Sequence, residues 1–474
     1  MDIGSKYLVK PFLKEVNSKK FMSSLNEAKI IDVPTNSGKT HHTLNTFIPH
    51  LHNEVDVQLS ILLYPTNEVF NHEDANAVLT NTTGVQLVHV TTSSDIKRIC
   101  TYLDNGIKVF APMTHQMLNL NRWFIDTIKS KSITGALFID EAHKHSGSSH
   151  WTTYADNQGH HNTKFLGTAY NNASELSKVW PSIFLLTATP TNEHLGRIEP
   201  VGSMNFRLIT TKPTREEMIP SCAWIGGENF YDLGSEYATE FAFETCLEEH
   251  RTKNERLGVK RSLMIACGIN TANQLYTTEY VIKLIKQYQL NAYEGNFPKN
   301  SVSIITGEGS AFVNFLPTTF GNNTYQPVYE EQERDNILKC LNDPEHPNNI
   351  VLFKNLGDCG MNVHSLGSYF SFKGTDTKTT ATLDYEEIIN NQIQRLGRPK
   401  RLWTGIHNTD FTTKWGYTLE EYVKTLSRAD KSRLAEINSY DFYLPDNDMN
   451  RKAVEVLRRD NPTKSQGQLW LSQN

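Results

Sequence analysis

The chain has 474 residues, a formal net charge of −5 at pH 7 and a hydrophobic content of 38%. This length exceeds the size at which a single hydrophobic core keeps growing, so we expect at least two domains. No apolar run resembles a membrane span and the six cysteines are scattered without a CxxC pair, which argues against a membrane-spanning protein, a disulfide framework and a thiolate zinc site.

The first motif follows an apolar stretch, Ala28–Val33, that is typical of a buried strand. It ends in Gly38, Lys39 and Thr40, as a phosphate-binding (Walker A) loop does. Glycine permits a turn whose N–H groups face a phosphate, lysine supplies positive charge, and a threonine hydroxyl can bind Mg²⁺. The loop departs from the usual pattern, because valine and asparagine stand where small residues are usual. The candidate nucleotide-binding residues of this loop are Pro34, Thr35, Asn36, Ser37, Gly38, Lys39 and Thr40.

A second apolar strand, Ala136–Ile139, runs directly into the sequence Asp-Glu-Ala-His, a DEAH box. A strand that ends in aspartate places a carboxylate at the carboxyl edge of a parallel sheet, where nucleotide sites form. We expect Asp140 to hold Mg²⁺ and Glu141 to polarise the attacking water.

Two further motifs follow in the chain. The stretch Leu185–Pro190 has the pattern of a buried strand that ends in a hydroxyl pair, Thr187 and Thr189. Further on, Arg398 and Arg401 are three positions apart, so both can lie on one helix face and stabilise charge on a phosphate.

The order of these four motifs resembles that of the superfamily 2 helicases of the DExH/DEAH type, especially the compact restriction-type and phage-type members. The resemblance covers roughly residues 28–401. It implies an α/β fold of two tandem RecA-like domains with parallel sheets, with ATP and Mg²⁺ in the cleft between the domains and a nucleic acid across both.

The resemblance also implies roles for single residues, some of them from weaker motifs. The expected catalytic residues are Glu141, Gln394, Arg398 and Arg401. The expected metal ligands are Thr40 and Asp140, and the nucleotide-binding set extends beyond the phosphate loop to Asp140, His143, Gly360 and Asn362. The expected nucleic-acid contacts are Pro65, Thr66, Thr114, His115, Thr306 and Gly307. Thr187 and Thr189 are expected to couple the nucleotide cleft to the nucleic acid.

Breaks in the hydrophobic pattern divide the chain into five parts. We expect an amino-terminal segment (1–21), a first RecA-like domain (22–211), a linker (212–250), a second RecA-like domain (251–405) and a small helical carboxyl-terminal extension (406–474). Residues 311–328 exceed what the fold needs and are either a strand-separating wedge or a surface insertion. The interval from Asp140 to Thr187 is also longer than the fold needs. It either overlies the nucleic acid or forms an exposed loop.

The sequence therefore predicts a nucleic-acid-dependent ATPase that acts as a helicase or translocase, with DNA favoured over RNA and no membrane partner. The alternative is a nucleotide-gated binding or scaffold subunit with little motor activity, because the altered phosphate loop could bind ATP and hydrolyse it slowly. The negative net charge is compatible with nucleic-acid binding if a basic groove is confined to one face. Because the amino terminus lacks a signal-peptide pattern, we expect a cytoplasmic protein of a bacterial or phage-infected cell.

Overall fold

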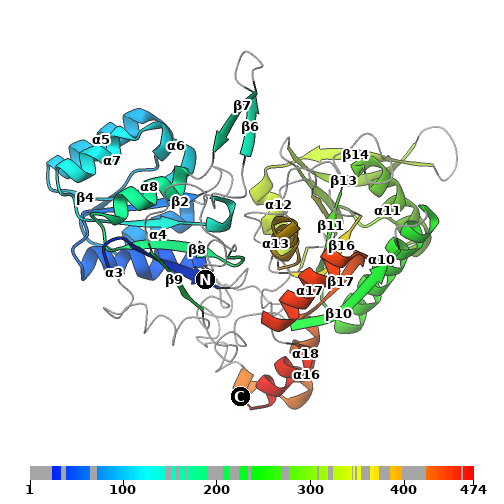
Figure 1. The fold of residues 1–474 in the computed structure, drawn as a ribbon. Helices are drawn as coiled ribbons and strands as arrows, with labels where there is room; N and C mark the ends of the chain where they lie inside the picture. Colours follow the sequence, from blue (N-terminus) through cyan, green and yellow to red (C-terminus); the bar gives the residue numbers. More distant parts are fainter. Residues whose placement is uncertain are drawn as a thin grey trace. The chain divides into compact units, whose positions relative to one another are not determined.

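The structure is a computed structural model, in which each of two compact units has its own sheet (Figure 1). The described part of the first unit ends at residue 212, and that of the second begins at residue 224. The described residues are 24–33, 39–64, 72–145, 151–155, 161–165, 168–190, 207–212, 224–232, 236–267, 277–306, 309–318, 324–343, 345–346, 350–353, 363, 365–372, 385–397, 423–460 and 463–473.

The first unit is built on a seven-stranded sheet in which every neighbouring pair is parallel, in the order β3-β4-β2-β5-β8-β1-β9. Its interior strands β2, β5 and β8 are buried along their whole length because the sheet is covered on both faces. In chain order the strands of this sheet are β1 (Glu27–Asp32), β2 (Leu59–Tyr64), β3 (Val85–Leu87), β4 (Lys108–Thr114), β5 (Gly135–Ile139), β8 (Ile183–Thr187) and β9 (Arg207–Thr211).

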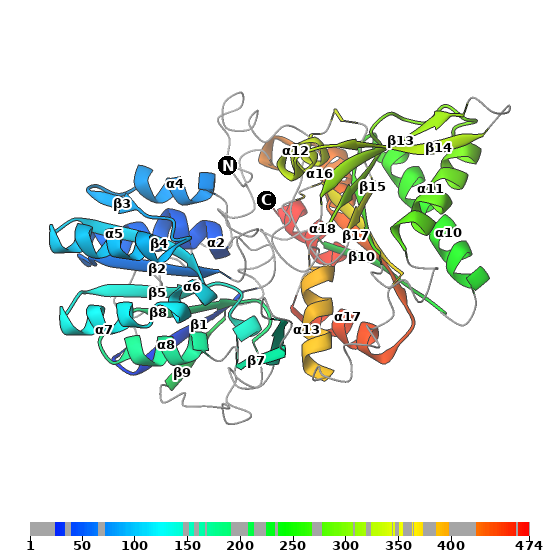
Figure 2. The same cartoon turned by 90° about the horizontal axis from the view of Figure 1, so that it is seen from above.

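Helices cover both faces of this sheet (Figure 2). Four of them, α5 to α8, pack on one face in a single apolar core. On the other face Phe47 of a π-helical segment contacts the stacked rings of Phe138 and Phe184. The helical segments are α2 (Lys39–His42), η2 (Thr43–Phe47), α3 (Ile48–Asn53), α4 (His72–Thr80), α5 (Ser93–Asp104), α6 (His115–Leu120), α7 (Trp123–Ser130), η4 (Ala142–His145) and α8 (Thr168–Ser177).

The long stretch between the second and third motifs contains a two-stranded antiparallel hairpin of β6 (Trp151–Ala155) and β7 (His161–Phe165). It forms a sheet separate from the seven-stranded one. The region therefore contains strand structure between residues 151 and 165, which its polar sequence does not suggest.

The second unit is built on an eight-stranded sheet in the order β10-β17-β16-β11-β15-β12-β13-β14. The first six strands of this order are parallel, and β13 and β14 add an antiparallel hairpin at one edge. The strands are β10 (Trp224–Tyr231), β11 (Ser262–Ala266), β12 (Val302–Ile305), β13 (Ser310–Pro317), β14 (Tyr325–Glu331), β15 (Ile350–Phe353), β16 (Leu366–Ser371) and β17 (Ser439–Pro445). Residues 311–328 thus belong largely to the edge hairpin.

The helices of the second unit also lie on both faces of its sheet. The apolar side chains of α10 and α11 pack on one face, and those of α12, α13 and α17 pack on the other. The helices are α10 (Glu236–Leu257), α11 (Thr278–Ala292), α12 (Arg334–Asn342), α13 (Tyr385–Leu396), α16 (Arg428–Ile437), α17 (Asp448–Asp460) and α18 (Lys464–Gln473).

The α/β fold with two parallel-dominated sheets is confirmed, and so is a helical carboxyl-terminal part. This part also contains β17, which pairs with β10 on one side and β16 on the other. In α18, Gly467 lies against the Trp224 indole so closely that a Cβ there would come within 2.1 Å of the ring. The carboxyl-terminal residues are therefore part of the second unit's core, together with β10 and α10, which the sequence analysis places largely in the linker. None of the described helices is long and apolar enough to cross a membrane.

Candidate active site at the carboxyl edge of the first sheet

Three neighbouring strands of the first sheet, β5, β8 and β1, end at the same edge because they are parallel. The register pairs Asp32 with Thr187, and the Val33 N–H donates to the Thr187 carbonyl at 3.0 Å. The Asp140 N–H donates to the Leu63 carbonyl of β2 at 2.8 Å. The sheet therefore collects residues from three of the predicted motifs at the edge where parallel α/β sheets bind their ligands.

Lys39 and Thr40 begin α2, directly after the phosphate-loop segment. The Lys39 ammonium donates to the Val33 carbonyl at 3.1 Å, and the Thr40 hydroxyl donates to Asp140 Oδ2 at 2.9 Å. Lys39 is also close enough to lower the pKa of Asp140 through its charge. These contacts bring the predicted first and second motifs together.

Asp140 is a buried carboxylate. Burial, reinforced by the charge of Glu141, raises the pKa of Asp140 to about 6, while Lys39 and the Thr40 hydroxyl act in the opposite direction. A buried anion with a neighbouring hydroxyl oxygen is a suitable place for a hard divalent cation, which prefers oxygen ligands. The Thr40 and Asp140 side chains therefore fit Mg²⁺.

Glu141 adopts a backbone conformation that non-glycine residues rarely adopt, with φ of +48°. Its N–H donates to Asp140 Oδ1 at 3.0 Å. After this turn the Glu141 carboxylate lies 3.4 Å from Nδ1 of His143. Strained backbone of this kind persists where the surrounding structure holds it, often at functional sites.

His143 connects the second motif to the third. Its Nδ1 lies 3.1 Å from the Thr187 hydroxyl, and that hydroxyl accepts a hydrogen bond from the Thr189 N–H at 3.1 Å. All three side chains are buried. A displacement of the Asp-Glu-Ala-His turn would therefore be transmitted to the end of β8.

The described nucleic-acid candidates have local structural partners. The Thr114 hydroxyl caps α6 by accepting from the Met117 N–H at 3.2 Å, and the Thr306 hydroxyl donates to the Gly309 carbonyl at 2.9 Å. His115 is only 6% exposed, and burial lowers its pKa to about 3 although a hydrogen bond at the Asp140 backbone opposes this. The His115 ring therefore lies in the interior, beside the candidate active site.

Trp123 is a surface aromatic residue that the sequence analysis did not select. It begins α7, just after the short helix that Thr114 caps, and is 41% exposed. The neighbouring Leu120 is 59% exposed. A tryptophan nine positions after Thr114 was the available sequence signal, but a tryptophan in an apolar stretch reads equally well as core.

Gln394 lies in α13 of the second unit and is buried. The other predicted site residues lie outside the described residues. They are Pro34, Thr35, Asn36, Ser37, Gly38, Pro65, Thr66, Gly307, Gly360, Asn362, Arg398 and Arg401.

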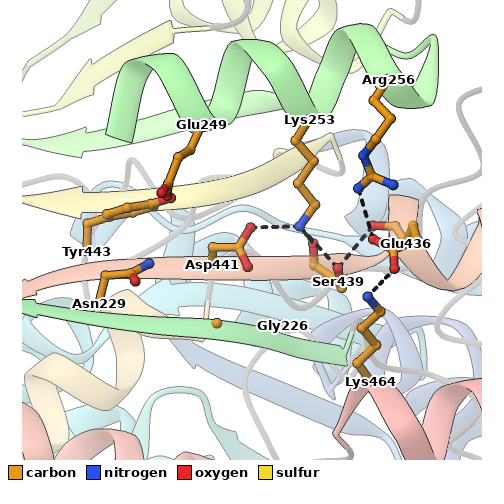
Figure 3. Close-up of a pocket in the computed structure, with 11 residues that line it drawn as sticks. Gly226, Asn229, Glu249, Lys253, Arg256, Glu436, Ser439, Asp441, Tyr443 and Lys464 are labelled. Atoms are coloured by element: carbon orange, nitrogen blue, oxygen red, sulfur yellow. Dashed lines mark hydrogen bonds and ion pairs between the residues drawn. The ribbon is translucent and has the colours of Figure 1, made fainter. Parts of the chain in front are cut away.

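A polar pocket of about 290 Å³ lies in the second unit, beside β10 and β17 (Figure 3). Lys253 of α10 donates to the carbonyl and hydroxyl of Ser439 at 3.0 and 3.1 Å and to Asp441 Oδ2 at 2.7 Å. Glu436 pairs with Arg256 and with Lys464. The charges that line this pocket therefore pair with one another and hold the carboxyl-terminal part against α10.

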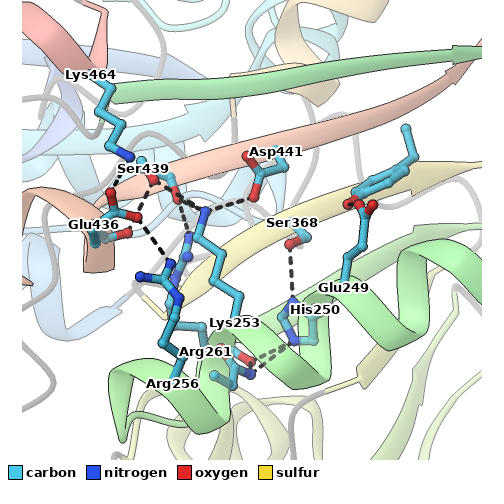
Figure 4. Close-up of polar contacts among 12 residues, drawn as sticks. Glu249, His250, Lys253, Arg256, Arg261, Ser368, Glu436, Ser439, Asp441 and Lys464 are labelled. Atoms are coloured by element: carbon cyan, nitrogen blue, oxygen red, sulfur yellow. Dashed lines mark hydrogen bonds and ion pairs between the residues drawn. The ribbon is translucent and has the colours of Figure 1, made fainter.

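Two buried basic residues, His250 and Arg261, belong to the polar contacts that also include Lys253, Glu436, Ser439 and Asp441 (Figure 4). Arg261 donates to the Ser439 carbonyl at 2.6 Å, and burial lowers its pKa to about 10. The His250 ring lies 2.9 Å from the Arg261 carbonyl and 3.0 Å from the Ser368 hydroxyl. Both residues have structural roles between α10, β11 and β17.

No protein-family model and no curated protein matches this sequence. Among solved structures, the chain is similar to the DUF1998 helicase MrfA bound to DNA, with a TM-score of 0.51 and 12% identity over 92% of this chain and 50% of that chain. It is also similar to the helicase Lhr of Mycobacterium smegmatis bound to ssDNA and AMP-PNP, with a TM-score of 0.48 and 10% identity over 97% of this chain and 51% of that chain. A third similar structure is that of S. cerevisiae Dbp5 bound to RNA and ADP BeF3, with a TM-score of 0.45 and 13% identity over 98% of this chain and 97% of that chain.

The likeness to MrfA shows the fold, which is that of two tandem RecA-like domains. The chain spans about half the length of MrfA and of Lhr.

Proposed function

We propose that the chain is a nucleic-acid-dependent ATPase of superfamily 2, of the compact DExH/DEAH type, which acts as a helicase or translocase. The observation that carries the proposal is the convergence of Lys39, Thr40, Asp140 and Thr187 at one edge of a parallel sheet. These residues come from three motifs, and together they offer a cation, two oxygen ligands and a link to the neighbouring strand.

The chemistry of the side chains supplies a role for each. Lys39 would place positive charge against the β- and γ-phosphates of ATP, and Thr40 and Asp140 would hold Mg²⁺, which neutralises charge on the same phosphates. Glu141 would accept the proton of a water molecule while the water oxygen bonds to the γ-phosphorus and the bond to ADP breaks.

The second RecA-like domain would complete the site, with ATP in the cleft between the domains. We expect Gly360 and Asn362 to contact the nucleotide and Gln394 to sense the γ-phosphate. Arg398 and Arg401 would stabilise the charge of the transition state, an effect worth on the order of 10³-fold or more in rate. The sequence resemblance supports these roles.

We expect nucleic acid to bind across both domains, through Pro65, Thr66, Thr114, Thr306 and Gly307. Trp123 would stack on a base, since its ring is exposed and exposed aromatic rings are the usual platforms for single strands. The interior position of His115 favours a supporting role for that residue. The His143, Thr187 and Thr189 contacts would couple this surface to the nucleotide. We favour DNA as the polymer, and the DNA bound in the MrfA structure supports this choice.

The test is steady-state ATP hydrolysis without nucleic acid and with single-stranded DNA, duplex DNA, branched DNA and single-stranded RNA, each over a salt series. Stimulation by DNA that weakens with salt is the expected result, because phosphate contacts release counterions. The Glu141→Gln variant is the control for contaminating ATPases: it should bind ATP and lose turnover by about 10²-fold or more.

Three results would change the conclusion. If only RNA stimulates hydrolysis, the polymer on which the protein acts is RNA and not DNA. Hydrolysis that is indifferent to every polymer would favour the nucleotide-gated subunit. If the Lys39→Ala variant binds ATP as tightly as wild type, the candidate active site is not the ATP-binding site.

A further inference from the structure

Helix α13, which carries Gln394 and precedes Arg398 and Arg401 in the sequence, packs beside α17 of the carboxyl-terminal part (Figures 1 and 2). Apolar side chains from both helices belong to one core on the same face of the second sheet. They are Ile389, Ile393 and Leu396 of α13 and Ala453, Val454 and Leu457 of α17.

A buried hydrogen bond crosses this apolar interface. The Gln392 side-chain amide of α13 donates to Asn450 Oδ1 of α17 at 2.7 Å. Gln392 is 8% exposed and Asn450 is 1% exposed, so water does not compete freely for either amide. Removing one partner would leave a buried polar group unsatisfied, which costs about 1–3 kcal/mol.

Asn450 is itself fixed by two other contacts. Its side-chain amide donates to the Pro445 carbonyl at the end of β17, at 2.8 Å, and its backbone N–H donates to the Asn447 side chain at 2.8 Å. Because β17 lies within the second sheet, these contacts form a rigid connection from the sheet through Asn450 to Gln392 of α13.

The hydrogen bond between Gln392 and Asn450 affects the position of α13 differently from the apolar contacts around it. Apolar side chains tolerate small sliding and rotation of one helix on another, whereas a hydrogen bond requires its donor and acceptor to stay within a few tenths of an ångström. The hydrogen bond therefore restrains the rotation of α13 about its axis and its sliding along α17. Gln394 lies only two residues from this anchor.

We infer that Gln392 and Asn450 are positioning residues for hydrolysis: they hold α13 so that Gln394 meets the γ-phosphate. This inference rests on the proposed function. Misplacement of a catalytic group by about 1 Å can cost on the order of 10²-fold in rate without a comparable loss of binding. Loss of the contact should therefore lower kcat and leave nucleotide affinity nearly unchanged.

The test compares Gln392→Met with a matched control, Gln289→Met. Gln289 is a buried amide of α11 that donates to the Ser301 hydroxyl at 3.2 Å, so its loss also removes one buried hydrogen bond from the second unit. Both variants should lose a few degrees of thermal stability. Only Gln392→Met should lose kcat, by ~10- to 100-fold, with the Kd of a fluorescent ATP analogue within about threefold of wild type. Gln392→Asn, which withdraws the amide by one methylene, is the milder variant if Gln392→Met does not fold.

Amide hydrogen exchange supplies a second measurement that does not depend on ATP turnover. Exchange should increase in α13 in Gln392→Met and stay unchanged there in Gln289→Met. A kcat within twofold of wild type in Gln392→Met, or an equal loss of kcat in both variants, would overturn the inference. If the wild-type chain hydrolyses no ATP with any polymer, the proposed function fails on that result alone, and unchanged exchange in α13 would then separately refute the anchoring.

Discussion

The Thr40 hydroxyl donates a hydrogen bond to the Asp140 carboxylate at 2.9 Å, although the two residues are 100 positions apart in the chain. The contact exists because β1 and β5 are parallel strands whose carboxyl ends reach the same edge of the sheet. The two oxygen ligands proposed for Mg²⁺ are thus in place in the protein itself, and binding of the ion does not require them to be brought together.

Replacement of this hydroxyl should strongly reduce metal-dependent turnover. Thr40→Val keeps the shape of the side chain but removes the oxygen, so we expect hydrolysis to fall by about 10²-fold and the Mg²⁺ requirement to rise. Thr40→Ser, which keeps the hydroxyl, is the control and should stay within a few-fold of wild type. A Mg²⁺ titration of ATP hydrolysis measures both, and a wild-type titration curve in Thr40→Val would exclude Thr40 as a ligand.

The contact between His143 and Thr187 should carry coupling between the two sites. In Thr187→Val the hydroxyl that faces His143 and the Thr189 N–H is lost. We expect basal hydrolysis within about threefold of wild type and little stimulation by nucleic acid. Thr187→Ser should behave as wild type. Full stimulation in Thr187→Val would show that coupling takes another route.

Trp123 should contribute to nucleic-acid affinity and leave basal hydrolysis unchanged. Stacking on one base is worth about 1–3 kcal/mol, so Trp123→Ala should weaken single-strand binding by roughly 5- to 150-fold. Trp123→Phe retains a ring and should lose less. Leu79→Ala, at another exposed apolar residue of the first unit, is the control. Fluorescence anisotropy of a labelled oligonucleotide measures all four proteins, and equal affinities for wild type and Trp123→Ala would exclude stacking there.

Local sequence patterns predict the strands that lead to the candidate site better than they predict the second sheet. The strands β5 and β8 are short apolar runs bounded by polar residues, and a buried strand of a parallel sheet has this pattern. In β17 the apolar run is interrupted by Asp441, and β10 contains Gly226 and Gly227, which read as a turn. The structure shows a register shift at these glycines, where a Cβ on Gly226 would come within 2.7 Å of Asp441 Oδ1.

Tertiary contacts therefore explain why β10 and β17 form strands despite their local sequences. Asp441 is tolerated inside the sheet because Lys253 of α10 pairs with it, and a side chain at Gly226 or Gly227 would crowd the Asp441 carboxylate. The partners are 188 positions apart for the ion pair. No local pattern reports such a pairing, just as none reports that His115 is directed into the interior.

Deletion of the carboxyl-terminal part should unfold the second unit. A chain that ends at residue 422 lacks β17, and this leaves β10 without its neighbour and exposes the core under α13. Calorimetry of the full chain and of this shorter chain measures the effect. We expect the cooperative transition of the second unit to disappear and that of the first unit to remain. Two preserved transitions in the shorter chain would contradict the structure.

Acid should destabilise the second unit through His250. Burial, with the charges of Arg261 and Lys253, lowers the pKa of His250 to about 3, whereas an unfolded histidine titrates near pH 6.5. Below about pH 6.5 the unfolded chain binds a proton that the folded chain does not, so this group's contribution to stability is complete above that pH and is lost as the pH falls toward 3.

His250 contributes at most about 1.4 kcal/mol per pH unit to the slope of the unfolding free energy against pH. Urea denaturation of wild type and His250→Gln between pH 4.5 and 7.5 measures it. The variant should show a shallower slope for the second unit. The slope for the first unit should be the same in both proteins, because burial there lowers the pKa values of His52, to about 4, and His115, to about 3. Identical slopes would show that His250 is protonated to the same extent in the folded and unfolded states.

The interior position of β17 also bears on how the chain is made. The strands of the first unit all precede residue 212, so that unit can complete its sheet while the ribosome is still translating the second. The second sheet lacks one of its interior strands until residues 439–445 have left the exit tunnel, and β10 must wait for a partner synthesised about two hundred residues later. Nascent chains stalled before that point would carry a folded first unit and an unpaired β10, which is the form most exposed to chaperones and to aggregation.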